Sequence, residues 1–268
     1  MKAENANLEG MDNQKQSPEP HSDQQLIGPA PQAAVFPGRW VGGASLILGP
    51  ALILTGALLR IQFHFFAPQQ LEAFEAHPTL ITAAYSCYAL GSVILCFGII
   101  SLATFIGAWS RVWGIWGGTL AILGLFTRTF HAGIDHLAFQ LVHVQSRELA
   151  WQAVSDSYRP FHVFRNLNGA IMAGWIVLAI GAYRSGTLNL LRSIALGLMV
   201  MVPFGTLKGT EIRAIGIIGL CVALVPLGIT MLRNGPPLSR KAIFWTVVIC
   251  VLGLIFNILA LFFPVLRN

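Results

Sequence analysis

Long apolar stretches without charge are the feature that most constrains what this chain can fold into. The stretch between Arg213 and Arg233 holds 19 consecutive uncharged residues, and about 20 apolar residues of helix cross the hydrocarbon core of a bilayer. Only 10% of the 268 residues are charged, against about 25% in soluble domains, and the mean hydropathy is +0.67. The sequence therefore predicts an all-α, polytopic membrane protein whose main partner is the lipid bilayer.

Seven stretches have the composition of a span. They are Trp40 to Leu59, Thr79 to Gly107, Val112 to about Phe130 with a continuation to His143, Leu167 to Tyr183, Arg192 to Lys208, Arg213 to Arg233 and Lys241 to Pro264. In the fifth, only 15 residues separate the flanking charges, so it spans only if Arg192 snorkels. We expect a seven-transmembrane-helix bundle, or six spans if the fifth segment does not cross.

The N-terminal region differs in composition from the rest. Residues 1–38 are polar and rich in Pro, Gln, Asn and acids, with too little apolar surface to offset the entropy of ordering, so we expect a disordered tail. Residues 39–266 then form the transmembrane helical bundle. Because the first apolar run starts near Trp40, no signal peptide is expected and the first span acts as an uncleaved anchor.

The charges and the cysteines argue against other classes of protein. The formal net charge is +6, but the Lys and Arg residues are mostly singles or pairs at the ends of apolar runs, so no nucleic-acid partner is expected. The four cysteines all lie in apolar runs without a CxxC spacing: Cys87, Cys96, Cys221 and Cys250. They are typical of buried thiols and not of a disulfide framework or a covalent haem site.

Seven spans divide the loops between two sides of the membrane. Face A carries the tail, the loop at Arg111 and residues 184–192 and 233–241, and face B carries residues 60–78, 130–166, 208–213 and the C-terminus. The face A loops hold six basic residues and no acid, whereas the acids beyond the tail all fall on face B: Glu72, Glu75, Asp135, Glu148, Asp156 and Glu211. Since cytoplasmic loops are rich in Lys and Arg, we expect an integral plasma-membrane protein with a cytoplasmic N-terminus and an extracytoplasmic C-terminus.

Histidines also gather on face B and suggest one polar site there. At 100° per residue, Arg128, His131 and Asp135 fall within about 60° of one another on a helix. An ionisable residue at membrane depth is a functional-site hypothesis by default. The candidate polar site is His131, Asp135, His136 and Arg128, helped by His64, His77 and His162. If the third helix ended near Phe130, this stripe would instead be an amphipathic surface segment.

Several functions fit these residues. The first is a multi-pass membrane protein whose His/Asp site acts in binding, sensing or regulation, since histidines titrate between about pH 5 and 8. An alternative is a metal-dependent hydrolase of a lipid or amide, with zinc on His131, Asp135 and His136, although no HExxH motif is present. A haem b site between two histidines is a further alternative. In the simplest interpretation, Arg128 and Asp135 pair structurally, and Tyr85 and Tyr88 only pack between helices.

Overall fold

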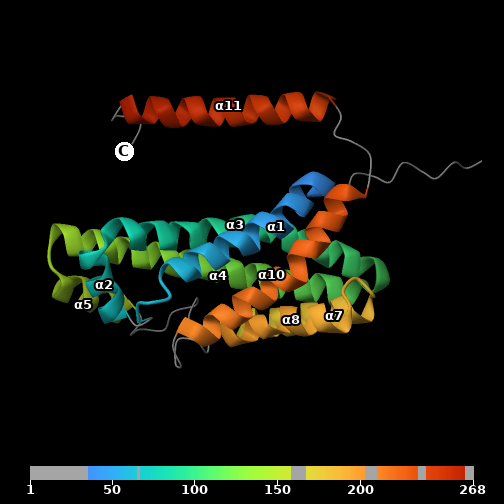
Figure 1. The fold of residues 1–268 in the computed structure, drawn as a ribbon, viewed down its shortest axis with the longest axis horizontal. Coiled ribbons are helices and arrows are strands. Elements are labelled where there is room, and N and C mark those ends of the chain that lie inside the picture. The colour runs from blue at the N-terminus through green and yellow to red at the C-terminus, as the bar shows by residue number, and fades with distance from the viewer. Residues whose placement is uncertain (1–35, 65–66, 158–166, 203–209, 235–239, 263–268) are drawn as a thin grey trace, which may run out of the picture. The chain divides into compact units, whose positions relative to one another are not determined.

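The computed structural model describes residues 36–64, 67–157, 167–202, 210–234 and 240–262. These residues form helices and contain no strand (Figure 1). The elements are α1 Gly38–Leu59, α2 Ala67–Ala76, α3 Pro78–Trp109, α4 Arg111–Val144, α5 Arg147–Ser157, α7 Asn168–Arg184, α8 Leu190–Gly197, the 3-10 turn η1 Leu198–Val200, α10 Thr210–Arg233 and α11 Arg240–Phe262. The all-α prediction is therefore confirmed for the described part of the chain.

Three of the helices are long and apolar enough to cross a membrane, and we call them the candidate spans. They are Gly38–Leu59, Pro78–Trp109 and Arg213–Arg233, which agree with the first, second and sixth predicted spans. Shorter apolar helical segments are Gly169–Arg184 of α7, Leu190–Val200 of α8 with η1, and Ile243–Gly253 within α11. Within the described residues, three helices thus combine the length and the apolar composition that a membrane span needs.

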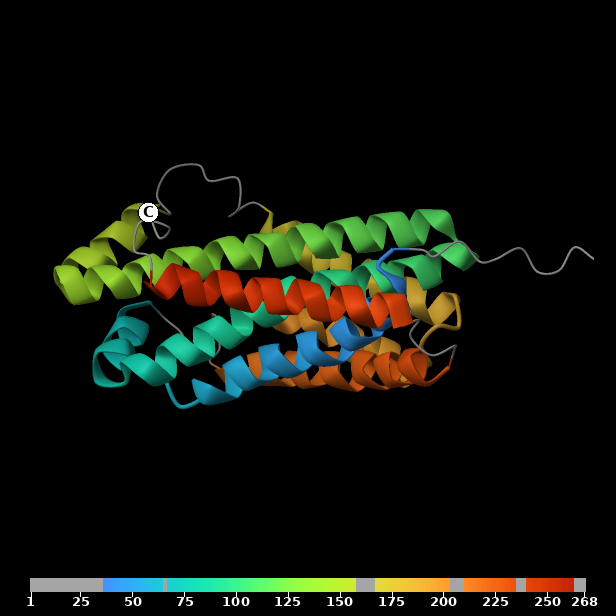
Figure 2. The same cartoon turned by 90° about the horizontal axis from the view of Figure 1, so that it is seen from above.

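The helices pack in a consistent order around an apolar core. Helix α1 contacts α3 and α10, α3 contacts α4, and α4 contacts α7 (Figures 1 and 2). Leu46 of α1, Leu95 of α3, Leu178 of α7 and Leu224 of α10 are all fully buried in one cluster. Such interdigitated packing holds helices together in lipid, where burial from water supplies little driving force between them.

Glycines bring the helix backbones into close approach. A Cβ added at Gly56 of α1 would lie 2.5 Å from the Ala84 carbonyl oxygen and 2.8 Å from the Tyr88 nitrogen of α3. Between α4 and α7, a Cβ at Gly174 would lie 2.5 Å from the Ala121 nitrogen. The atoms in the way belong to the backbone, so no rotation of a side chain would make room for the added Cβ.

We expect Gly56→Ala to lower the free energy of unfolding by about 1–3 kcal/mol, the usual cost of overpacking. The matched control is Gly133→Ala, because a Cβ at Gly133 of α4 meets nothing within 4 Å and alanine favours helix. The apparent melting temperature of each purified variant in an uncharged detergent measures the difference. Equal melting temperatures for the two variants would contradict the close approach of α1 and α3.

The predicted loops of face B contain two helices that the sequence analysis does not anticipate. Helix α2 lies in the predicted loop of residues 60–78 and α5 in the connection of residues 130–166, and the two lie together at the same end of α3 and α4 (Figures 1 and 2). A second apolar cluster joins them to those helices. Its buried members are Leu71, Ala73, Phe74, Ile81, Tyr85, Ala138, Phe139, Ala150 and Val154.

Helix α4 also differs from the shorter version of the third predicted span. It continues without a break through Phe130 to Val144, so the interpretation as a separate surface segment is wrong. With 34 residues, α4 is about 51 Å long at 1.5 Å per residue, which exceeds the roughly 30 Å hydrocarbon core. The part beyond Phe130 is where α2 and α5 pack.

Candidate functional site

Two arginines are buried at the face B ends of candidate spans. Arg60 directly follows α1 and is 4% exposed, and Arg213, near the start of α10, is 5% exposed. Removing a guanidinium from water is costly unless its surroundings replace the lost hydration. The neighbours of these two side chains therefore determine what the site can bind.

Tyrosine rings of α3 lie against both guanidinium groups. The Cζ atom of Arg60 lies 4.5 Å from the ring centroid of Tyr85 and 5.3 Å from that of Tyr88. The Cζ atom of Arg213 lies 5.0 Å from the ring centroid of Tyr88. These are cation–π distances, and in desolvated surroundings each such contact contributes about 2 kcal/mol. Tyr88 thus bridges two arginines that are distant in sequence.

Helix α4 adds a carboxylate and a third arginine. Asp135 interacts electrostatically with Arg60, Arg213 and Arg128. The arginine–tyrosine cluster, as we call this group, consists of Arg60, Tyr85, Tyr88, Arg128, Asp135 and Arg213. With Asp135 ionised, these described side chains carry three positive charges and one negative charge, a net charge of +2.

Burial changes the proton affinities of the ionisable groups at the edge of the cluster. Asp135 lies beyond the apolar part of α4 that ends at Phe130, and burial raises its pKa from 3.8 to about 6, although Arg60, Arg213 and Arg128 lower it. Burial, followed by the charge of Arg213, lowers the pKa of Arg60. Both shifts reflect the loss of water around charged groups.

Helix α2 covers one side of the cluster. The Tyr85 hydroxyl donates a hydrogen bond of 3.2 Å to Oε1 of Gln70, and the Gln70 amide nitrogen donates to the His64 carbonyl oxygen. Gln70 is 3% exposed, so this bond lies in the interior. The Tyr85 ring also packs edge-on against Phe139, at a centroid distance of 4.9 Å.

The structure brings only part of the predicted polar site together. Arg128 and Asp135 of α4 belong to the cluster, whereas four predicted or neighbouring histidines lie against phenylalanine rings. These ring pairs are His77 with Phe63 at 5.7 Å, His131 with Phe130 at 5.9 Å, His136 with Phe139 at 6.3 Å and His143 with Phe74 at 5.4 Å. The His64 side chain is exposed, and His162 lies outside the described residues.

Metal ligands do not converge in the part of the chain that the structure describes. No group of three or more His, Cys, Asp or Glu side chains there could hold a metal ion. The zinc hypothesis on His131, Asp135 and His136 therefore has no ligand set among these residues. The haem b hypothesis, which pairs His131 or His136 with His64 or His162, stays a prediction.

Four members of the cluster are absent from the predicted site. In the sequence, Arg60 and Arg213 have the position of charges that flank a span, and Tyr85 and Tyr88 that of residues packed between helices. The signal that could identify them is the position of each arginine at the face B end of its apolar run, level with a pair of tyrosines one helical turn apart. Only the packing of α1, α3 and α10 shows that these arginines and tyrosines lie at the same level.

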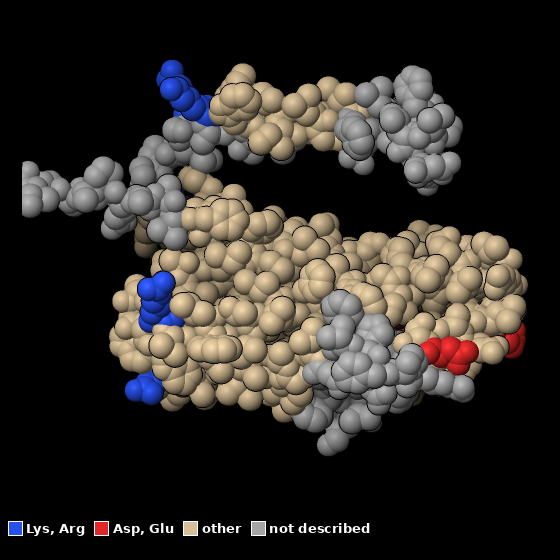
Figure 3. Space-filling view, turned by 180° about the vertical axis from the view of Figure 1, so that it is seen from behind, with Lys and Arg blue, Asp and Glu red and all other residues tan. Residues whose placement is uncertain are grey.

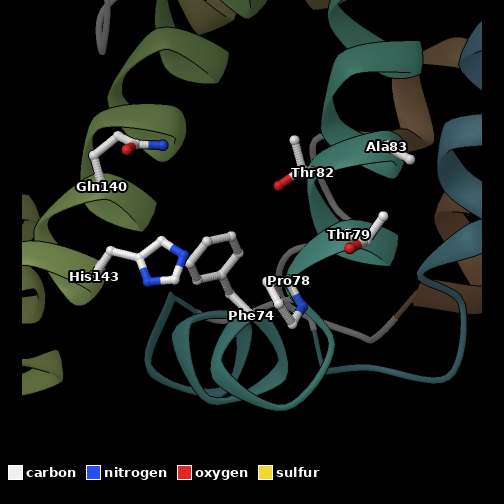
Figure 4. Close-up of a pocket in the computed structure, with 7 residues that line it drawn as sticks. All are labelled: Phe74, Pro78, Thr79, Thr82, Ala83, Gln140 and His143. Atoms are coloured by element: carbon white, nitrogen blue, oxygen red, sulfur yellow. The ribbon is translucent and has the colours of Figure 1, made fainter.

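A surface pocket lies beside the second apolar cluster. It has a volume of about 450 Å³ and opens between the start of α3 and the end of α4 (Figure 4). Its lining residues are Phe74, Pro78, Thr79, Thr82, Ala83, Gln140 and His143. The Phe74 ring stacks on Phe139 at 4.6 Å, and Phe139 meets Tyr85, so aromatic contacts lead from this pocket to the cluster.

On the side of the molecule seen in Figure 3, exposed charges of opposite sign lie at different ends. In the view of Figure 3, acidic side chains gather at the end where α2 and α5 lie, and basic side chains gather at the opposite end. The exposed acids of the two short helices are Glu72, Glu75, Glu148 and Asp156. On this acidic face, Arg147 makes an exposed ion pair of 3.3 Å with Glu75, while Arg60 and Arg213 are turned into the interior.

Comparison with known proteins assigns no family. No family model matches the chain, and neither does a curated protein or a solved structure.

Proposed function

We propose that this chain is a seven-span plasma-membrane protein that binds an anionic ligand in the arginine–tyrosine cluster, in a sensing or regulatory role. The observation that carries the proposal is the convergence of Arg60 and Arg213, 4% and 5% exposed, on the ring of Tyr88. Guanidinium groups are the preferred partners of carboxylate and phosphate groups. An anion that binds the folded protein at this site and not the unfolded chain raises the free energy of unfolding.

The path of the fifth predicted span, to which α8 and η1 belong, supports a membrane crossing by this segment. In α10, Gly219 lies against the Ala195 backbone and Gly216 against that of Leu198, so the segment runs antiparallel to α10. The chain enters it on face A, shortly after Arg184, whose Cζ atom lies 5.4 Å from the Trp109 ring. The described part of the segment ends at Val202, and α10, the next described helix, has Arg213 against Tyr88 near its start on face B.

The outer surface of α4 supports a third span. Before Phe130, this helix exposes large apolar side chains that suit lipid contact. They are Val112, Ile115, Trp116, Leu123 and Phe126, between 38% and 63% exposed. Arg111, which starts the helix, and Asp135, beyond its apolar part, then lie on opposite sides of the membrane.

Cysteine labelling of intact cells tests the sidedness. We expect a membrane-impermeant maleimide to label Glu148→Cys in α5, because face B is extracytoplasmic in this proposal. Ser185→Cys, at the face A end of α7, should react only after the membrane is permeabilised. Unmutated protein gives the background from the native cysteines. The reverse labelling pattern would mean an inverted bundle.

Ligand-induced stabilisation tests the anion site. In an uncharged detergent, phosphate or succinate at millimolar concentration should raise the apparent melting temperature of the wild-type protein above that in chloride. Arg213→Gln should lose this increase, because one charged hydrogen-bonding partner is worth about 1.5–3 kcal/mol. The matched control is Arg147→Gln, which removes a half-exposed arginine of the same face. Equal responses of the two variants, or no response of the wild type, would overturn the proposal.

A further inference from the structure

We propose that the pocket between the start of α3 and the end of α4 binds the uncharged polyhydroxyl headgroup of a membrane lipid, as in a glycolipid. This site is separate from the arginine–tyrosine cluster and takes a different class of ligand. The chemistry of its lining, its depth relative to the membrane and the apolar surface that continues from it support this assignment.

The pocket is lined by groups that suit a hydroxyl-rich ligand. Thr79, Thr82, Gln140 and His143 supply hydroxyl, amide and imidazole groups, and none of the described lining residues is Asp, Glu, Lys or Arg. A sugar hydroxyl both donates and accepts hydrogen bonds, as these groups together do, so it needs no opposite charge. The volume of about 450 Å³ lies in the range of small-molecule sites, about 300–1,000 Å³.

Polar groups of two helices point into this pocket from opposite sides. The Thr82 hydroxyl of α3 and the Gln140 amide of α4 face each other across it (Figure 4). Within the described residues neither group has a hydrogen-bonding partner, whereas the Thr104 hydroxyl of α3 donates to the Ile100 carbonyl oxygen. Thr82 and Gln140 are both exposed, so a ligand reaches them without displacement of a helix.

The depth of the pocket agrees with the outer part of the lipid headgroup layer. Helix α3 is a candidate span that ends at Trp109 on face A, and about 20 residues of helix, about 30 Å, cross the hydrocarbon core. The core therefore ends near Ala89, and Thr82 lies about 10 Å farther out along the helix. Each headgroup layer is about 5–8 Å thick, so the pocket lies at the level of a sugar attached to the lipid glycerol.

An exposed apolar stripe continues from the pocket toward the hydrocarbon core. At about 100° per residue, Leu90 and Val93 of α3 lie within about 80° of Thr82 around the helix axis, and both are exposed. On α4, the exposed Leu137 lies within about 60° of Gln140. The acyl chains of a lipid whose headgroup fills the pocket would lie along this stripe.

Binding to a lipid of defined headgroup tests the assignment. The full-length protein is reconstituted into phosphatidylcholine nanodiscs that contain monoglucosyldiacylglycerol or the same mole fraction of diacylglycerol, which has the same chains and no sugar. We expect the glucolipid to raise the apparent melting temperature and diacylglycerol to have little effect. Thr82→Val keeps the shape of the side chain without its hydroxyl. It should raise the mole fraction required about fivefold, the effect of one neutral hydrogen bond.

The matched control is Thr104→Val, which removes a hydroxyl from an exposed position of α3 outside the pocket and should keep the response. A second variant, Ala83→Trp, fills the pocket and should abolish the response. Because Ala83 is exposed, this variant should melt like the wild type in phosphatidylcholine alone. Equal effects of the glucolipid and diacylglycerol, a response retained in both Thr82→Val and Ala83→Trp, or no response of the wild type would overturn the proposal.

Methyl glucoside in solution separates the two sources of a sugar. Stabilisation by the glucolipid and by methyl glucoside, both lost in Ala83→Trp, would support recognition of the sugar itself, and stabilisation by the glucolipid alone would support a lipid ligand. If only methyl glucoside stabilises the protein and Ala83→Trp keeps that effect, the assignment is wrong, because sugars excluded from a protein surface stabilise folded states in general. The anion-binding proposal is tested separately, since none of these variants alters the arginine–tyrosine cluster.

Discussion

Tyr88→Ala is expected to lower the free energy of unfolding by about 3–5 kcal/mol, the usual cost of removing a buried aromatic ring. Tyr88 is 8% exposed and its ring contacts both Arg60 and Arg213, whose Cζ atoms lie 5.3 Å and 5.0 Å from the ring centroid. The truncation leaves a cavity and also removes the aromatic face that stabilises two buried charges. Denaturation with SDS in mixed micelles measures the loss.

The matched variant Tyr88→Phe separates the ring from its hydroxyl group. Phenylalanine keeps the ring face and almost all of the volume, so we expect a loss of about 1.5 kcal/mol or less, the range of one neutral hydrogen bond. A triple variant gives a second readout. When Arg60→Leu and Arg213→Leu are added to Tyr88→Ala, we expect a higher free energy of unfolding than for Tyr88→Ala alone, because both buried charges beside the missing ring are then removed. Equal losses for Tyr88→Ala and Tyr88→Phe would contradict the cation–π role of the ring.

The apolar helices could be predicted because their signal is local. In α1, α3 and α10 the uncharged run has the length of a span, and the observed ends differ from the predicted ones by only a few residues. Helices α2 and α5 carry no such run. Their apolar residues, such as Leu71 and Val154, become core residues only because they pack on the protruding parts of α3 and α4. That packing partner is remote in sequence, so composition alone suggests loops.

Only two of the six residues of the arginine–tyrosine cluster could be predicted from the sequence, for the same reason. The helical spacing of Arg128 and Asp135 is visible within one segment, and the polar stripe of α4 follows from it. Arg60 and Arg213 look like ordinary flanking charges, since most arginines at span ends snorkel to water. Their burial follows from α1 and α10 both packing beside Tyr88, a contact between residues more than 120 positions apart in the case of Arg213. The histidines have the clearer sequence signal, and yet four of those described lie against phenylalanine rings: His77, His131, His136 and His143.

Asp135→Asn is expected to make the stability of the protein less dependent on pH. Burial raises the pKa of Asp135 from 3.8 to about 6, so the folded state binds this proton more tightly than the unfolded state. The resulting contribution to stability is fully present below about pH 4 and is lost as the pH rises through about 6. At about 1.4 kcal/mol for each tenfold change in proton affinity, the loss amounts to about 3 kcal/mol, or several degrees in melting temperature.

Asparagine cannot ionise, so Asp135→Asn should match the wild type near pH 4 and melt at a higher temperature at pH 7. The control is Glu72→Gln, which neutralises an exposed carboxylate of α2 and should leave the pH profile of the wild type unchanged. Asp135→Asn also raises the net charge of the cluster from +2 to +3. This variant should therefore bind sulfate, whose charge is constant in this pH range, more tightly than the wild type at pH 7. An Asp135→Asn protein that is less stable than the wild type at every pH would mean that the carboxylate is needed as a counter-charge for Arg60 and Arg213. The cluster would then be a structural ion network with no surplus charge for a ligand.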